Sequence, residues 1–424
     1  MKHAAVVLMV LLPALASAAE TEASLKARAA RIHASAIVVD THEAVPYRLT
    51  EKWADISLRG APGQGQVDIP KLKDGGVTGS FFAAYVPASF AKSGGAARET
   101  LELIDLIHRV AGSSPDLVFA DSPDGIRAAK RAGKIAVLIG IEGGHAIEDS
   151  LGALSAYARL GARYMTLTHT NTNHWADSSG SFFAWDFDPK TFAVHGGLTG
   201  FGREVVLEMN RLGMLVDVSH VSDKTIEDVL AVSKAPVFAS HSSCRALAGM
   251  PRNLSDEQIR AIGARGGVVM VNVSSTFLDQ KVVDDFVRQK AALAPRIEEI
   301  RKKNEGDPAK SEAEIAKLIS SLVRPRASWT AAVDHIEHVM KVAGPAAAGL
   351  GTDFDGIEDP PTGLEDVSKL PRITEELLRR GHSEEEVRGV LGENFLRFWD
   401  RARKVAGEMG TAKLPLPQMK ESGS

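Results

Sequence analysis

The sequence predicts an α/β protein that folds as a (β/α)8, or TIM, barrel. Short runs rich in Val, Ile and aromatic residues alternate with longer segments of helical periodicity along the 424-residue chain, which is typical of repeated βα units around a parallel sheet. Eight such runs can be counted, and six of them end on a residue able to bind a metal or transfer a proton. Functional groups of TIM barrels lie at the carboxyl ends of the strands, so the positions of these residues support the barrel independently of the periodicity.

The expected strands are short, apolar and spread over residues 36–352. They are Ala36–Thr41, Thr78–Val86, Lys134–Ile141, Tyr164–Thr168, Met214–Ser219, Pro236–Ser240, Gly267–Val273 and Ala348–Thr352. The helices expected between them include Glu99–Ala111, Pro123–Ala132, Ser150–Leu160, Gly200–Leu212, Asp223–Val232 and Ser255–Ala264. Ser255 and Gln258 have the spacing of a capping box, in which two side chains satisfy free backbone N–H groups at a helix start.

The two ends of the chain and one internal segment are expected to lie outside the barrel. Residues 1–19 have the basic start, short apolar run and small-residue end of a cleavable signal peptide, so we expect a periplasmic or secreted protein without stable membrane insertion after processing. A single barrel domain is expected over residues 20–406. The charge-rich residues 277–328 separate the seventh and eighth strands and predict a solvated pair of helices appended to the barrel. Residues 407–424 are expected to form a flexible tail.

The composition excludes several classes of function. Fifty Lys and Arg residues against 54 Asp and Glu residues give a formal net charge of −4, which offers no basic surface for nucleic acid. The one cysteine, Cys244, cannot form an intramolecular disulfide or a Cys-rich zinc module, and we expect it to be a small buried apolar residue. No phosphate-binding loop or dinucleotide fingerprint occurs, so nucleotide chemistry has no support. The 13 histidines are the residues that most need a role.

The polar residues at the strand ends have the chemistry of a metal site. They are His42, Glu142, His169, His220, His241 and Asp353. Histidine nitrogens and carboxylate oxygens are the usual ligands of a hydrolytic zinc, and one carboxylate can bridge two ions. Glu142 ends an apolar run, where a buried carboxylate needs a cation or hydrogen-bond donors around it. Each residue alone is better explained as a hydrogen-bonded core residue, but their shared place at strand ends favours a metal centre that activates water.

Longer sequence blocks carry a family resemblance. They are Gln66–Pro70, Gly75–Val77, Phe81–Ala83, Ile141–His145, Leu167–Thr170, Asp217–Val221, Ser240–Ser242, Pro251–Asn253, Gly267–Asn272, Gly351–Gly356 and Gly392–Phe395. Together they resemble the membrane (renal) dipeptidase family, zinc peptidases of the amidohydrolase-like barrel group, over about residues 36–400. The resemblance implies two Zn²⁺ ions, with Glu142 bridging them, His42 binding the first ion, and His220 with His241 binding the second.

The resemblance also implies how a substrate is held. His169 is expected to polarise the scissile carbonyl and stabilise the oxyanion as it forms. Arg252 is expected to bind the free carboxylate of the substrate through its planar guanidinium. Asp353 is expected to hold the substrate amine and carry a proton from the bridging water to the leaving nitrogen. Capture of both charged ends limits the substrate to a dipeptide, and a homodimer is the assembly that the resemblance suggests.

One position departs from the family's pattern. The family's first-strand motif is His-x-Asp, with both residues as ligands of the first ion, but here Ala44 stands where the aspartate belongs. Glu43 is not expected to substitute, because successive side chains of a strand point to opposite faces. Asp40 has the right parity but is expected roughly 7 Å deeper along the strand. The first ion therefore loses one carboxylate ligand.

The missing carboxylate leaves three outcomes open: a weakened two-metal site, a site with one tightly held ion, or loss of the chemistry. Because His169, Arg252 and Asp353 all remain, we expect metal-dependent hydrolysis of the peptide bond of dipeptides by a metal-activated water. The alternatives are another amide hydrolase, acting on an N-acyl amino acid or a β-lactam, and a catalytically impaired peptide-binding barrel.

Several other polar residues are expected to lie outside this chemistry. His145 is expected to orient a neighbouring group, and Asp355 to help position Asp353. His335 and His338 share one face of a barrel-covering helix and are expected to be solvated.

Overall fold

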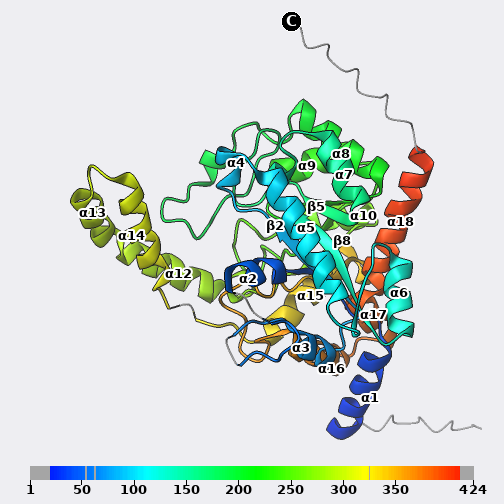
Figure 1. The fold of residues 1–424 in the computed structure, drawn as a ribbon. Coiled ribbons are helices and arrows are strands. Elements are labelled where there is room, and N and C mark those ends of the chain that lie inside the picture. The colour runs from blue at the N-terminus through cyan, green and yellow to red at the C-terminus, as the bar shows by residue number, and fades with distance from the viewer. Residues whose placement is uncertain (1–19, 53–54, 62–63, 324, 411–424) are drawn as a thin grey trace, which may run out of the picture.

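The computed structural model describes residues 20–52, 55–61, 64–323 and 325–410, and its centre is a closed barrel of eight parallel strands (Figure 1). The strands are β1 (Val39–Glu43), β2 (Gly79–Tyr85), β4 (Ile135–Glu142), β5 (Ala162–Thr166), β6 (Leu215–Asp217), β7 (Phe238–Ala239), β8 (Val268–Val271) and β9 (Ala348–Leu350). Each pairs with the next around the ring, and β4 returns to β2 with Tyr85 opposite Glu142. The predicted TIM barrel is confirmed.

Every predicted strand overlaps a strand of the barrel, although the boundaries differ. The first strand begins at Val39 and continues through Glu43, so that His42 lies within β1 instead of after it. One further strand, β3 (Leu117–Phe119), pairs with the first residues of β4 and lies outside the closed ring. Its three residues are too few to give a recognisable alternation in the sequence.

The six helices predicted between the strands are confirmed to within a few residues. They are α5 (Ala96–Gly112), α6 (Pro123–Arg131), α7 (Leu151–Arg159), α8 (Gly200–Leu212), α9 (Asp223–Val232) and α10 (Asp256–Ala264). All except α5 begin after a Ser or Thr whose side chain accepts a free backbone N–H of the first turn. Ser255 and Gln258 form the predicted capping box.

Other helices cover the barrel and its ends. They are α1 (Glu22–Ser35), α2 (Val45–Lys52), α3 (Ile69–Asp74), α4 (Phe90–Ser93), α15 (Thr330–Ala343), α16 (Pro371–Arg379), α17 (Glu384–Arg388) and α18 (Asn394–Met409). Short 3₁₀ segments occur at Gly144–Ile147, Pro189–Phe192, Pro345–Ala347 and Val367–Lys369, and a π-helical turn at Gly389–Glu393. α2 follows β1 directly, so its first turn lies beside the carboxyl end of that strand.

The segment between β8 and β9 forms an arm of three helices, not the expected solvated pair (Figure 1). After the short α11 (Ser275–Leu278), the helices are α12 (Gln280–Ala292), α13 (Ala294–Lys303) and α14 (Pro308–Ser320). They have an apolar cluster of their own, which consists of Phe286, Ile297, Ile315 and Ile319 and packs against Phe182, Phe183 and Trp185. One side of the arm is therefore buried, because apolar residues spaced along its charge-rich sequence pack against one another.

The interior of the barrel is filled by a layer of aromatic side chains. Phe81, Tyr164, Phe238 and Phe395 pack with ring centroids 5.3 to 5.9 Å apart. Phe395 comes from α18, so this helix closes one end of the barrel. Gly140 makes room for the layer, because a Cβ there would lie 2.0 Å from the Cζ of Tyr164.

The predicted signal peptide and most of the predicted tail lie outside the described residues. α18 runs to Met409, so residues 407–409 continue a helix where a flexible tail was expected. Glu408 and Met409 are good helix formers, and the predicted tail contains no proline before Pro415. Among the described residues, no helix has the length and apolar character needed to cross a membrane.

Candidate metal centre

The six residues predicted at the strand ends meet at one end of the barrel. His42 lies in β1 and Glu142 ends β4, while the other four follow their strands by two or three residues. Their side chains face the barrel axis, as expected for groups at the carboxyl ends of parallel strands. The described residues contain two groups suited to an ion, His42 with Glu142 and His241, and Glu142 with His169 and His220.

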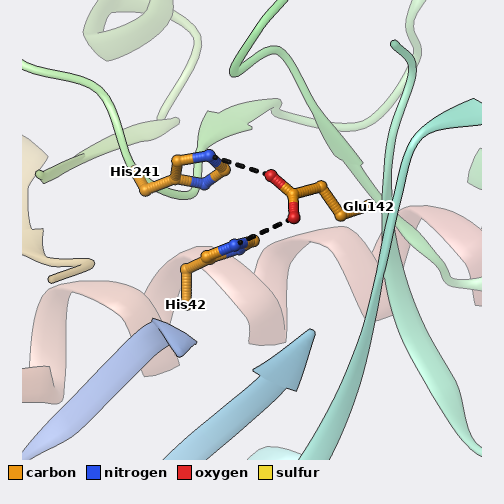
Figure 2. Close-up of side chains that lie close together, drawn as sticks. All are labelled: His42, Glu142 and His241. Carbon is orange, nitrogen blue, oxygen red and sulfur yellow. Dashed lines mark ion pairs between the residues drawn. The ribbon is translucent and has the colours of Figure 1, made fainter. Parts of the chain in front are cut away.

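Glu142 lies at the centre of the cluster and directs its two oxygens to different histidines (Figure 2). Its Oε1 lies 3.1 Å from His220 Nε2, 3.5 Å from His241 Nε2 and 3.8 Å from His169 Nε2. Its Oε2 lies 3.5 Å from His42 Nε2. A carboxylate between two imidazole sets in this way is able to bridge two ions.

The histidine nitrogens around Glu142 are arranged better for binding a metal than for hydrogen bonding to one another. His42 Nε2 is buried and has no hydrogen-bond partner. His220 Nε2 and His241 Nε2 are 2.9 Å apart, so at most one of these nitrogens can donate to the other. Imidazole nitrogens that converge on a carboxylate with unused lone pairs have the chemistry of a zinc-type ligand set. The Oε1 side offers more such ligands than the Oε2 side.

His241 is held from behind by a hydroxyl and a carboxylate. Its Nδ1 lies 2.6 Å from Ser240 Oγ, which lies 2.6 Å from Asp217 Oδ2. Because the carboxylate can only accept, Ser240 donates its single proton to Asp217 and accepts from the Nδ1–H of His241. That tautomer leaves Nε2 of His241 without a proton and facing Glu142, which is the form that binds a metal.

His42 has a different support. Its Nδ1 lies 2.8 Å from the hydroxyl of Tyr164, the buried aromatic residue for which Gly140 makes room. The ring is thereby fixed with Nε2 towards Glu142. The support is a neutral phenol, in contrast to the carboxylate behind His241.

His220 and His169 are held mainly through their backbone and packing. His220 adopts a left-handed conformation with φ 67°, and its carbonyl accepts from the Ser179 N–H at 2.8 Å. Strain of this kind persists only where the surrounding structure enforces it, as at functional sites. The ring of His169 packs edge-on against Tyr85, with centroids 4.7 Å apart.

The charges within the cluster set the protonation of its members. Burial alone would lower the pKa of His42, but the carboxylates of Glu142, Asp353 and Asp217 together outweigh it and raise the pKa to about 9. Burial lowers the pKa of His169 to about 4, and it lowers the pKa values of His220 and His241 well below the usual range. Three of the four imidazoles are therefore neutral near pH 7, as metal ligands must be.

Arg252 and Asp353 complete the site. The buried Arg252 donates to Ser242 Oγ at 3.1 Å, and its Nε has no partner. Its guanidinium lies over the ring of Phe277, 5.4 Å from the centroid. Asp353 is in a left-handed conformation with φ 63°, and its Oδ2 accepts from Asn272 Nδ2 at 2.9 Å. Burial raises the pKa of Asp353 to about 6, against the opposing effect of His42.

Some residues of the site were not predicted from the sequence. Tyr85 ends β2 and Asn272 follows β8, so the two strands without a predicted polar end also contribute to the site. Asn272 and Asp217 lie within blocks that carry the family resemblance, and Ser240 immediately precedes His241. These positions are the only sequence features that could have indicated their place in the site. Nothing in the sequence around Tyr164 marks its hydroxyl as a partner of His42.

The first strand provides no substitute for the carboxylate missing at Ala44. Ala44 is buried at the start of α2 and lines the cavity above the cluster. Glu43 points to the neighbouring strand, where it accepts a hydrogen bond from Ser80 Oγ. Asp40 accepts from the backbone and hydroxyl of Thr352.

Two expectations about other polar residues are wrong, and the structure identifies the group that His145 contacts. His335 is fully buried, because its Nδ1 accepts from the Cys244 N–H at 2.9 Å and its Nε2 donates to the Leu278 carbonyl at 3.1 Å. Asp355 pairs with Arg48 at 2.7 Å and does not contact Asp353 through a hydrogen bond. His145 Nε2 donates to a backbone carbonyl, that of Val86, at 3.0 Å. Cys244 is buried, as expected.

The fold and this cluster define the class of the protein: a TIM barrel whose strand-end histidines and glutamate form a centre suited to metal ions. The model of the membrane dipeptidase family, peptidase family M19, matches residues 26–413. The chain belongs to the membrane dipeptidase family. Its members are metallopeptidases, in agreement with the ligand-type groups around Glu142.

Individual relatives show the same affiliation. The chain is 34% identical over 372 residues to Dipeptidase 3 of Rattus norvegicus, a match that covers 87% of this chain and 65% of that protein. Among solved structures, the probable dipeptidase PvdM from Pseudomonas aeruginosa superposes with a TM-score of 0.77 and 26% identity, over 91% of this chain and 100% of that one. A metallo peptidase from Rhodobacter sphaeroides, liganded with a phosphinate mimic of the dipeptide L-Ala-D-Ala, gives 0.68 and 25%, over 87% and 99%.

Proposed function

We propose that the protein hydrolyses the peptide bond of dipeptides with the help of bound zinc. The observation that carries the proposal is Glu142, whose two oxygens face separate imidazoles, close to Arg252 with its partnerless Nε and to the half-buried Asp353. Zinc bound there supplies an acidified water and polarises the scissile carbonyl. The related metallo peptidase liganded with a dipeptide mimic supports a dipeptide as the substrate class.

The protein's own residues bind and orient the substrate in this proposal. Arg252, with its Nε unpaired and its position fixed by Ser242, binds the terminal carboxylate. His169, neutral near pH 7, donates through a ring N–H to the carbonyl oxygen as it becomes negative. Asp353 accepts from the substrate amine, and a carboxylate whose pKa is about 6 can also take a proton and return it to the leaving nitrogen.

The ligands also support a proposal for metal stoichiometry. His220, His241 and Oε1 of Glu142 would provide three donors for one zinc, the number of protein ligands typical of a catalytic zinc. The Oε2 side offers His42, with Asp353 Oδ1 3.9 Å from His42 Nε2, and a methyl group at Ala44. We therefore assign the tight ion to the Oε1 side and a weak ion to the Oε2 side.

Purified protein from residue 20 onwards tests the proposed activity. With added Zn²⁺, it is expected to release free amino acids from L-Ala-L-Ala or L-Ala-D-Ala, and chelation should abolish the release. Glu142→Gln is the matched inactive control, because the amide keeps the shape and removes the charge. Absence of turnover by the wild-type protein over a panel of L,L and L,D dipeptides would contradict the proposal. If the wild-type protein then still binds dipeptides, it is a catalytically impaired peptide-binding barrel instead.

Location and assembly are further proposals. The basic start, apolar run and small residues of positions 1–19 support export to the periplasm or medium through a cleavable signal peptide. Expression of the whole chain in a bacterium, followed by fractionation and N-terminal sequencing, tests it: a mature start near residue 19 or 20 is expected, and a retained Met1 in the cytosol contradicts it. A homodimer is proposed from the family resemblance and is tested by light scattering.

A further inference from the structure

We infer that the site also accepts peptides longer than a dipeptide, extended at their amino end, and cleaves their carboxyl-terminal peptide bond. The inference rests on the proposed function and concerns the cavity that opens onto the metal centre. This cavity has a volume of about 1630 Å³ and includes Glu142, His169 and His220 in its wall. Pockets of roughly 300 to 1,000 Å³ already hold drug-sized ligands, so a dipeptide leaves much of this cavity unfilled.

The open space lies on one side of the reaction centre. Asp353, proposed to face the amino end of the substrate, lines the cavity, as do Ala44, Tyr47 and Tyr85. Arg252, proposed to bind the carboxylate, is not among the described residues that line the cavity, and it is buried against the carbonyl of His241 and the ring of Phe277. Room for additional substrate therefore extends from the amino end and not from the carboxyl end.

Two small residues open the way past Asp353. Ala44 presents a methyl group where the family's pattern has a carboxylate, and Gly356 presents no side chain at all. A Cβ at position 356 would lie 2.4 Å from Asp353 Oδ1 and 3.2 Å from the Cβ of Ala44. Because Ala44 and Gly356 have small side chains or none, the space between Asp353 and α2 is not filled by side-chain atoms.

Beyond this opening, two walls are suited to one further amino-acid residue. Tyr47 and Tyr85 pack edge-on with ring centroids 5.4 Å apart, and Tyr85 also packs against His169, so the three rings form one aromatic wall of the cavity. Ala44, Tyr47 and Arg48 have the i, i+3, i+4 spacing of one helix face. Arg48 forms a buried ion pair with Asp355 at 2.7 Å, which fixes a polar wall. Such a pair of walls suits an apolar side chain and the amide groups of a peptide.

The reaction on the longer substrate is the same hydrolysis. Water adds across the carboxyl-terminal amide, the C–N bond breaks, the carbonyl carbon gains a hydroxyl and the leaving nitrogen gains a proton. The products are one free amino acid and a shortened peptide, with no oxidation or reduction. At the amino side, Asp353 accepts a hydrogen bond from an amide N–H where a dipeptide presents its ammonium group.

Zinc-loaded protein tests the inference with Ala-Ala and with Ala-Ala-Ala that carries ¹³C in its carboxyl-terminal residue. Chromatography with mass detection of the released amino acid is the readout, because only labelled alanine reports cleavage of the carboxyl-terminal bond. Initial hydrolysis of the carboxyl-terminal bond of Ala-Ala-Ala is expected with a kcat/KM above about a hundredth of the Ala-Ala value, and a lower value overturns the inference. Tyr47→Ala is expected to reduce kcat/KM about fivefold for the tripeptide alone. An equal effect on both substrates, or none, overturns the subsite; Leu101→Ala, on the exposed face of α5, is the matched control.

Failure of the proposed function gives a different result. If neither substrate is cleaved, the proposed hydrolysis is wrong, and calorimetric binding of the two peptides to the zinc-loaded protein then decides the inference. Ala-Ala-Ala must bind at least as tightly as Ala-Ala for the subsite to stand. Weaker binding of the tripeptide overturns it.

Discussion

The two oxygens of Glu142 lie in unequal surroundings. On the Oε1 side, His220 and His241 approach to 3.1 and 3.5 Å and His169 to 3.8 Å. On the Oε2 side, His42 is the one imidazole, at 3.5 Å, and Ala44 presents a methyl group nearby. With alanine at position 44, immediately after β1, the Oε2 side has fewer ligand-type groups than the Oε1 side.

The supports behind the ligands follow the same inequality. His241 donates to Ser240, whose proton goes to the carboxylate of Asp217, so a negative charge lies behind this imidazole. His42 is supported by the neutral hydroxyl of Tyr164. A carboxylate behind a ligand makes the imidazole more basic and fixes its tautomer, which increases its affinity for a metal. The Oε1 side therefore has both more imidazoles and a charged support, whereas the Oε2 side has a neutral one.

Replacement of the shared ligand is expected to have the largest effect, because it removes the charge from both sides at once. Glu142→Gln should lower bound zinc to a small fraction of one equivalent and reduce dipeptide hydrolysis by about a thousandfold or more. Elemental analysis and initial rates measure the two quantities. Glu102→Gln, on an exposed face of α5, is the control. A Glu142→Gln variant with full metal content would show that the carboxylate of Glu142 is not needed to bind the metal.

A pair of support variants separates the two sides. Ser240→Ala removes the hydroxyl behind His241 and should weaken the tight zinc about 10- to 100-fold, whereas Tyr164→Phe should leave the tight zinc within about twofold. Competition with a chromogenic chelator measures the affinity. Similar losses in both variants would show that the tight ion is shared between the two sides and that the comparison is wrong.

His335, a buried histidine outside the centre, shows how burial changes a histidine pKa where both ring nitrogens bind backbone groups. Burial lowers the pKa of His335 to about 4, and both its nitrogens bind backbone groups. Between about pH 6.5 and 4, the unfolded chain binds a proton that the folded chain refuses, so stability falls as pH falls. At pH 5, this histidine should reduce the free energy of unfolding by about 2 kcal/mol relative to pH 7.

Urea unfolding of the wild type and of His335→Gln at pH 7 and pH 5 checks that contribution. The glutamine can donate and accept hydrogen bonds but does not titrate, so its loss of stability between the two pH values should be smaller by about 2 kcal/mol. Equal losses in the two proteins would mean that His335 is protonated in the folded chain.

The smallest effect is expected from the residue that packs on Arg252. Phe277→Leu removes the ring under the guanidinium and should raise KM for a dipeptide about threefold with kcat within about twofold. A dipeptide amide lacks the terminal carboxylate, so its turnover should respond less to the substitution. Steady-state kinetics on the two substrates measures the difference. A fall in kcat with unchanged KM would place Phe277 in a different role.

Much of the fold and of the centre follows from local sequence. The short apolar runs and the helical patterns predict the eight strands and the intervening helices, because each signal is contained within a short stretch of the chain. The residues His42, Glu142, His169, His220, His241 and Asp353 are predicted for the same reason, since each lies at or just after the carboxyl end of its own strand. β3 has only three residues, and the third helix of the arm packs through a few apolar residues within a charge-rich sequence, so local patterns do not show either element.

The residues that support the centre depend on contacts far apart in the chain. Tyr164 reaches His42 over 122 positions, and Gly140 permits it by lacking a side chain. His335 carries no local sign of burial, because its partners Cys244 and Leu278 lie 91 and 57 positions away. Three-dimensional packing decides such roles, so a sequence predicts the ligands of this centre better than it predicts their supports.

The most direct measurement of the central claim is a zinc titration against a competing chelator, on the protein as it stands and on Ala44→Asp. The unequal surroundings of Glu142 predict one tight equivalent per chain in the natural protein and two in the variant, with faster dipeptide hydrolysis by the variant. Two equally tight equivalents in the natural protein, or no second equivalent in Ala44→Asp, would contradict the assignment of Ala44 to the weak side of the centre.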